Sequence, residues 1–136
     1  MLVVDASAIA ELLLVRPAAA DVERHMAAHQ YALHAPHLLD VEVLSALRRV
    51  VAAGDASPQR AGEAIRNLLD LPVERYPHDI LVDRIWELRG NFSSYDAAYL
   101  ALAEALTETG APLLTADVRL ARAAQAHTGV DVLVAG

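Results

Sequence analysis

Short apolar runs alternate with longer amphipathic stretches along the whole chain. The apolar runs predict buried strands at residues 2–5, 31–35, 73–76, 113–115 and 130–134. Between these runs, apolar residues recur every three or four positions, which predicts helices. The predicted helices cover residues 7–14, 18–29, 37–54, 57–71, 78–89, 94–109 and 117–127.

This regular alternation indicates an α/β domain. Strands without polar alternation are typical of a parallel sheet that helices cover on both faces. The 136 residues suffice for one domain, so we expect residues 1–136 to form a single unit. In such sheets ligands bind beyond the carboxyl ends of the strands, and candidate functional residues are therefore sought there.

Composition excludes several classes of function. The chain has no cysteine, which excludes disulfides, thiolate nucleophiles and cysteine-bound zinc. All 11 basic residues are arginine, so the lysine that a P-loop requires is missing. The net charge of −7 disfavours loose electrostatic binding to nucleic acid. No run approaches the roughly 20 apolar residues of a membrane span, and we expect a cytoplasmic protein.

Acidic residues occupy the positions where a site is expected. Asp5 ends the first predicted strand, Asp117 follows the strand at 113–115, and Asp96 lies in the first turn of a helix. Glu42 borders the apolar side of the long helix after Pro36. Each acid alone is better explained as a helix cap or a solvated residue than as part of a site.

Considered together, the acids predict a cation site. Two unit charges about 5 Å apart repel by about 3 kcal/mol at an effective dielectric of 20, so convergent carboxylates need a counter-cation. A site made only of oxygen ligands indicates Mg²⁺ or Mn²⁺. Asp40 competes with Glu42 for this role, but two residues apart on a helix they face opposite sides, so only one can serve.

Four segments resemble the acidic motifs of PIN-domain ribonucleases, and they are VVDASAIAELLL, APHLLDVEVLSALRR, SSYDAAYLALAEAL and LLTADVRLARAA. The length and the spacing most resemble VapC-type toxins of bacterial toxin–antitoxin pairs. The resemblance implies a three-layer α/β/α fold in which a five-stranded parallel sheet gathers the acids at one edge. By position, Asp5, Glu42 and Asp96 match the three central acids, and Asp117 matches a more variable fourth. Ser7 and Thr115 match hydroxyl positions that contact the acids or metal-bound water in the family.

The resemblance further implies a Mg²⁺- or Mn²⁺-dependent endoribonuclease that holds its ion with the four acids. Metal-activated water would cleave RNA by in-line attack and leave 5′-phosphate and 3′-hydroxyl ends. The expected substrate is RNA, with tRNA favoured, and the expected partners are a cognate antitoxin and a second copy of the chain. Candidate phosphate-binding residues are Arg48, Arg49, Arg119 and Arg122.

Two alternatives remain open at this level. A metal-free ribonuclease could use a pair of the six histidines as acid and base, and it would leave cyclic phosphate ends. A non-catalytic module of the same fold could use the acids only as helix caps. In that case an apolar stretch such as residues 12–15 could form a groove for a partner helix.

Overall fold

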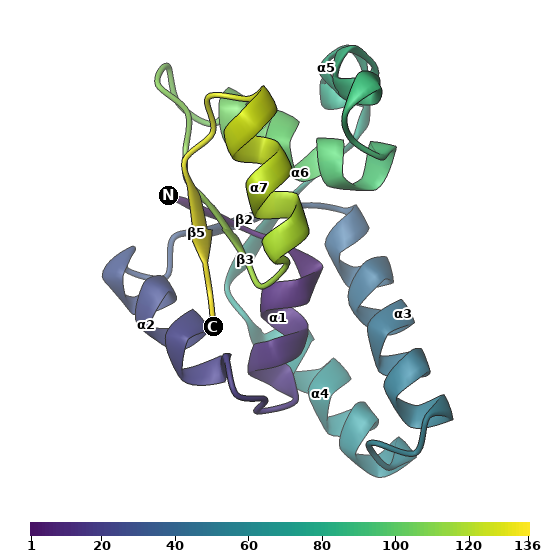
Figure 1. Cartoon of the computed structure of the whole chain (residues 1–136). Coiled ribbons are helices and arrows are strands. Elements are labelled where there is room, and N and C mark those ends of the chain that lie inside the picture. Colours follow the sequence, from purple (N-terminus) through teal and green to yellow (C-terminus); the bar gives the residue numbers. More distant parts are fainter.

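A computed structural model describes all 136 residues, which form five strands and seven α-helices (Figure 1). Two short 3₁₀ segments, η1 (Asp79–Leu81) and η2 (Leu88–Gly90), flank α5. In chain order the other elements are β1 (Leu2–Val4), α1 (Ala6–Leu13), α2 (Ala19–Ala28), β2 (Leu33–Pro36), α3 (Leu38–Ala52), α4 (Pro58–Asp70), β3 (Val73–Tyr76), α5 (Val82–Glu87), α6 (Ser94–Ala105), β4 (Leu113–Thr115), α7 (Val118–His127) and β5 (Val132–Val134).

The five strands form one parallel sheet in the order β3-β2-β1-β4-β5. β1 is the central strand, where Leu2 pairs with Leu33 of β2 and Val3 pairs with Leu113 of β4. The chain runs from β1 towards β3 and then returns to β4, so the strand order reverses between β1 and β4. This reversal point is where open α/β sheets bind ligands.

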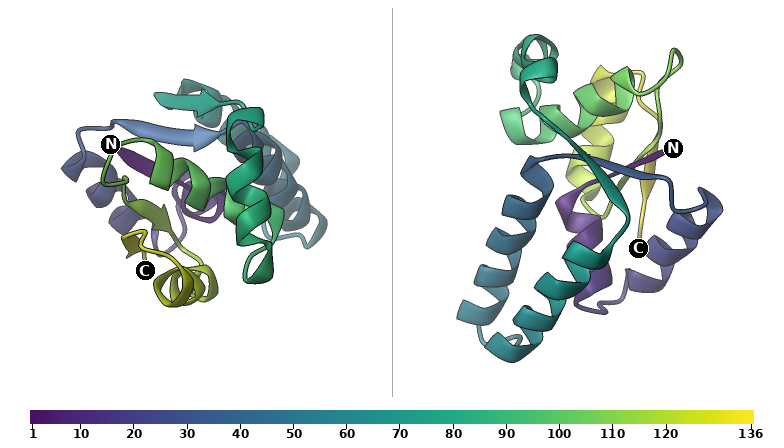
Figure 2. Two further views of the ribbon diagram at one scale, coloured as in Figure 1. Left: turned by 90° about the horizontal axis from the view of Figure 1, so that it is seen from above. Right: turned by 180° about the vertical axis from the view of Figure 1, so that it is seen from behind.

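Helices cover both faces of the sheet, as Figures 1 and 2 show. Parallel connections are right-handed, so a reversal of strand order moves the following helices to the opposite face. The segment from α1 to α4 therefore forms one layer, and α5, α6 and α7 form the other. The predicted three-layer α/β/α fold is confirmed.

Helix α6 is the most deeply buried helix of the domain. Every residue from Ala97 to Ala103 is buried, and the helix packs against β1, β2 and β4. The same helix begins near the carboxyl ends of these strands, with Ser93 accepting a hydrogen bond from the backbone N–H of Asp96 at 3.2 Å. Burial of the helix thus fixes the position of Asp96 relative to the sheet.

Several predicted boundaries differ from the structure. The second strand begins at Leu33 because Gln30 and Tyr31 adopt left-handed backbone conformations, with φ of 53° and 54°, in the preceding turn. The predicted helix at 78–89 is broken into η1, α5 and η2, and α5 buries none of its residues. The helix predicted to reach Thr109 ends at Ala105, and Gly110 lies in the turn that follows.

The remaining elements agree with the predicted boundaries within a few residues, with β5 shortened to Val132–Val134. None of the helices combines the length and apolar character that crossing a bilayer requires.

Candidate active site

The four predicted acids line one pocket of about 320 Å³ beside the carboxyl ends of β1 and β4. Asp5 directly follows β1, and Asp117 lies two residues after the end of β4. Asp96 lies at the start of α6, and Glu42 lies in α3. The pocket is lined by Asp5, Ala6, Ser7, Glu42, Ala46, Arg49, Asp96, Tyr99, Asp117 and Arg119.

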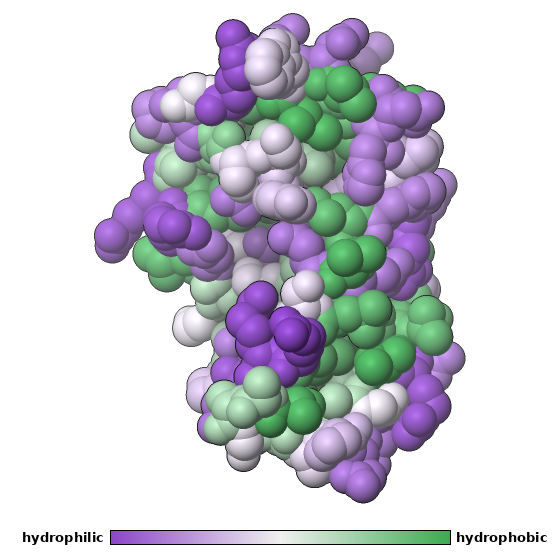
Figure 3. All heavy atoms as spheres, turned by 90° about the vertical axis from the view of Figure 1, so that its right-hand side faces the viewer, coloured by the Kyte–Doolittle hydropathy of each residue, from purple (hydrophilic) through white to green (hydrophobic).

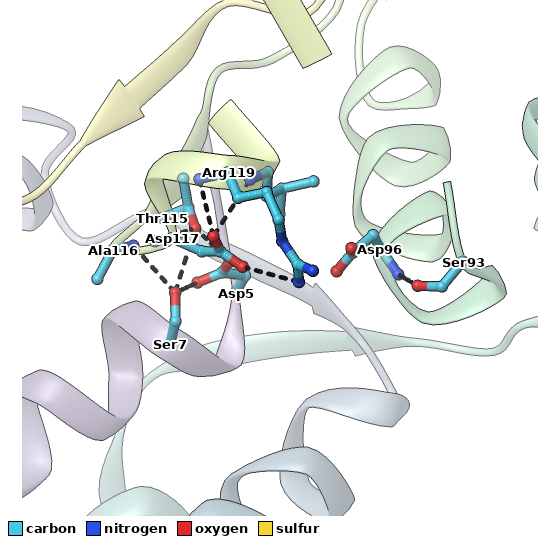
Figure 4. A network of polar contacts seen from close by, with 9 residues as sticks. Asp5, Ser7, Ser93, Asp96, Thr115, Ala116, Asp117 and Arg119 are labelled. Atoms are coloured by element: carbon cyan, nitrogen blue, oxygen red, sulfur yellow. Dashed lines mark hydrogen bonds and ion pairs between the residues drawn. The ribbon is translucent and has the colours of Figure 1, made fainter. Parts of the chain in front are cut away.

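Asp5 is buried, and both of its carboxylate oxygens accept hydrogen bonds (Figure 4). Oδ1 accepts from the Ser7 hydroxyl at 2.7 Å and from the Ala8 backbone N–H at 3.0 Å, so Asp5 caps α1. Oδ2 accepts from the Thr115 hydroxyl at 2.5 Å. The N-cap of α1 is therefore Asp5, and the Ser7 hydroxyl orients the Asp5 carboxylate.

Ser7 and Thr115 connect the ends of β1 and β4. The Ser7 hydroxyl accepts from the backbone N–H of Ala116 at 2.9 Å, and the Thr115 hydroxyl accepts from the backbone N–H of Asp117 at 3.0 Å. The two hydroxyl oxygens lie 3.1 Å apart. These bonds fix the segment that carries Asp117 against the segment that carries Asp5.

Asp117 and Asp96 both lie at helix N-termini. Asp117 caps α7, and its Oδ1 accepts from the backbone N–H groups of Arg119 and Leu120 at 2.9 and 3.2 Å. Its Oδ2 lies 3.9 Å from the Arg119 guanidinium. The Asp96 carboxylate accepts no backbone N–H group and faces the Arg119 guanidinium across the pocket (Figure 4). Both side chains therefore keep oxygens available to a ligand.

Glu42, and not Asp40, faces the pocket. Glu42 Oε1 accepts a hydrogen bond from the Tyr99 hydroxyl at 2.7 Å. Asp40 lies on another side of α3 and binds the Arg75 guanidinium through two hydrogen bonds of 2.7 and 2.9 Å. Sequence reasoning missed Tyr99, although its position three residues after Asp96 places it on the same side of α6.

Ionised carboxylates are energetically unfavourable in this pocket. The pKa of Asp5 is raised to about 6, mainly by burial and to a smaller extent by the charge of Asp117, against the opposing effect of its three hydrogen bonds. Burial also raises the pKa of Glu42, with a contribution from the charge of Asp96. The pKa of Asp96 is raised by burial and by the charge of Asp117. Three acids in one pocket are thus held where negative charge is unfavourable.

The donor set fits a hard divalent cation. As placed, no three of the carboxylates converge closely enough to form an all-protein cage for a metal ion. Mg²⁺ does not require such a cage, because it retains several waters and binds through one or two carboxylates. Mutual repulsion also keeps uncompensated carboxylates apart. Asp5, Glu42, Asp96 and Asp117 are the residues that would hold the ion, directly or through water.

The arginines predicted to bind phosphate divide into two groups. Arg49 and Arg119 line the acidic pocket. Arg48 lies instead in a separate apolar groove between α3 and α4, together with Leu44 and Val51, and Arg122 is exposed on α7 outside the pocket. Figure 3 shows the side of the molecule on which α3 lies, where apolar and hydrophilic patches adjoin.

No histidine lines the acidic pocket. His34 is buried and contacts the Tyr76 hydroxyl at 2.8 Å, while His78 accepts from the backbone N–H of Leu38 at 2.9 Å. His29, the C-cap residue of α2, contacts the backbone carbonyl of His25. A histidine acid–base pair therefore has no support at this site.

Comparison with known proteins shows the family of the chain. The family model described as PIN domain matches residues 2–126. Ribonuclease VapC9 of Mycobacterium tuberculosis is 42% identical over 133 residues, which cover 98% of each chain. Ribonuclease VapC1 of the same organism is 45% identical over 122 residues, or 89% of each chain.

A solved structure is also similar. The crystal structure of PAE2754 from Pyrobaculum aerophilum has a TM-score of 0.66 and 26% sequence identity, and the match covers 96% of this chain and 81% of that one. Sequence, fold and the grouped acids lead to the same assignment. The chain belongs to the PIN-domain family and, within it, to the VapC ribonucleases.

Proposed function

We propose that this protein is a metal-dependent endoribonuclease and the toxin of a toxin–antitoxin pair. The observation that carries the proposal is the meeting of four carboxylates from four separate segments in one pocket, where burial and mutual repulsion raise the pKa of three of them. Such an arrangement is unfavourable for stability alone, and it becomes favourable when a cation is bound. The relatives named as ribonucleases support the same reaction.

In this proposal Asp5, Glu42, Asp96 and Asp117 would hold Mg²⁺ or Mn²⁺, which would supply an activated water near neutral pH and offset negative charge on the phosphate. Ser7 and Thr115 hold the Asp5 carboxylate in place through the bonds described above. Arg49 and Arg119 line the pocket and attract the RNA phosphates into an otherwise acidic site. In-line hydrolysis leaves a 5′-phosphate and a 3′-hydroxyl.

The proposal extends to the partners. The relatives' VapC names support a cognate antitoxin, and we propose a tRNA substrate and a homodimer by analogy with the family. Of residues 12–15, considered above as a groove, Leu13 is buried and Leu12 and Leu14 are partly buried against the core, so only Val15 is largely exposed. The apolar groove between α3 and α4 is the better candidate surface for an antitoxin segment.

The proposed experiment incubates the purified protein with total RNA, with and without Mn²⁺ or Mg²⁺, and sequences the cut ends. We expect cleavage only with metal, and 5′-phosphate ends. The matched pair of variants is Asp96→Asn, which should abolish cleavage, and Asp55→Asn, an exposed acid outside the pocket, which should not. A non-catalytic binding module would show no cleavage and no stabilisation by Mn²⁺. Cyclic phosphate ends that persist in chelator would contradict the proposal.

A further inference from the structure

Tyr99 is the only aromatic residue that lines the acidic pocket. Its side chain is 1% exposed, and its hydroxyl donates to Glu42 Oε1 at 2.7 Å. A buried tyrosine hydroxyl requires a hydrogen-bond partner, and here that partner is one of the candidate metal ligands. The contact therefore joins the core of α6 to the acidic site.

Core packing fixes the place of the Tyr99 hydroxyl. The ring lies in the most deeply buried stretch of α6, between Ala98 and Leu100. Tyr99 is thus a fixed donor, whose position the core packing determines.

Glu42 depends on this donor more than the other acids depend on theirs. Asp5 and Asp117 each accept backbone N–H groups as helix caps, and Asp96 has a short side chain at the start of α6. Glu42 lies within α3 on a longer side chain, and the Tyr99 hydroxyl is its only hydrogen-bond donor in the protein. Without that bond the carboxylate is free to change rotamer.

We propose that Tyr99 is a positioning residue, which holds Glu42 in one rotamer through Oε1 and leaves Oε2 free for the cation. The inference rests on the proposed metal-dependent function and adds to the four carboxylates a residue that is not itself an acid. Hydrogen-bond partners that orient metal ligands typically change metal affinity or activity by about 10–100-fold when they are removed. Tyr99→Phe keeps the ring and removes only the hydroxyl.

The test measures Mn²⁺ binding by titration calorimetry in the absence of RNA. We expect Tyr99→Phe to bind Mn²⁺ about tenfold more weakly than the wild type. The matched control is Tyr95→Phe, because Tyr95 lies on the same helix, is 60% exposed and does not line the pocket. The Mn²⁺ affinity of this control should equal that of the wild type. In cleavage assays at saturating Mn²⁺, Tyr99→Phe should lower kcat and leave the KM for RNA unchanged.

A double-mutant cycle separates positioning from a general structural effect. In a Glu42→Ala background, Tyr99→Phe should cause no further loss of Mn²⁺ affinity. If Tyr99→Phe binds Mn²⁺ with wild-type affinity, the inference is wrong and the proposed function still stands. The same conclusion follows if Tyr99→Phe lowers the Mn²⁺ affinity tenfold in the Glu42→Ala background as well. If the wild type itself binds no Mn²⁺, the proposed function fails and the inference fails with it.

Discussion

Asp5→Asn should stabilise the metal-free protein near neutral pH. The pKa of the Asp5 carboxyl is raised from an ordinary 3.8 to about 6, mainly by burial. At about 1.4 kcal/mol per pKa unit, ionising this group in the folded state costs about 3 kcal/mol. Asparagine removes the charge and still caps α1, because its amide oxygen accepts the Ala8 N–H as well as a carboxylate does.

The sign of the pH dependence follows from proton linkage. The folded state binds a proton at Asp5 more tightly than the unfolded state does, so this residue makes the wild type less stable as pH rises from about 4 to about 6. Asp5→Asn does not lose stability in this way, because asparagine does not ionise. The variant should therefore equal the wild type near pH 4 and exceed it above pH 7 by about 1–3 kcal/mol, or roughly 3–9 °C in Tm.

The assay is urea unfolding followed by circular dichroism, in chelator, at pH 4, 5.5 and 7.5. Asp55→Asn is the matched control, because Asp55 is exposed and forms no ion pair. Saturating Mn²⁺ should stabilise the wild type more than Asp5→Asn, since the cation offsets the same unfavourable charge. Refutation would be a variant that is less stable than the wild type at pH 7.5, or a difference that does not change with pH.

Three further substitutions test separate parts of the site. Asp40→Asn weakens the pair with Arg75, so it should lower the free energy of unfolding by about 1 kcal/mol in urea titrations while RNA cleavage stays at the wild-type rate; lost cleavage would contradict the choice of Glu42. Thr115→Val leaves Asp5 Oδ2 without its donor and should cost about 1–3 kcal/mol and weaken Mn²⁺ binding; an unchanged melt and affinity would count against that bond. Arg119→Gln should weaken RNA binding and flatten its dependence on salt by about one unit of slope, and an unchanged slope would remove Arg119 from the RNA contacts.

The strand pattern predicted the architecture because the sheet is buried on both faces. All residues of β1 and β4 are buried, so their sequences are apolar apart from Thr115 and are recognisable as strands. Asp5 and Asp117 follow these strands, so the sequence alone predicts that both acids lie at the carboxyl edge of the sheet. The helical periodicity also separated Glu42 from Asp40, since two residues apart they occupy different sides of α3.

Features that depend on tertiary contacts were not predictable in this way. The contact between Tyr99 and Glu42 joins residues 57 positions apart, and an apolar helix with a single tyrosine resembles ordinary core packing. Residues 78–89 contain no proline or glycine, so no local signal in the sequence predicts that this helix is broken into η1, α5 and η2. Arg48 lines the apolar groove between α3 and α4, whereas the adjacent Arg49 lines the acidic pocket. This difference depends on where α4 packs, which the sequence does not predict.

The central claim is that the four carboxylates hold a divalent cation. Anomalous diffraction from crystals grown with Mn²⁺ tests it most directly. The account predicts an anomalous peak in the pocket lined by Asp5, Glu42, Asp96 and Asp117, and loss of the peak in Asp96→Asn crystals. An empty pocket in crystals of a protein that cleaves RNA under the same Mn²⁺ concentration would contradict the account.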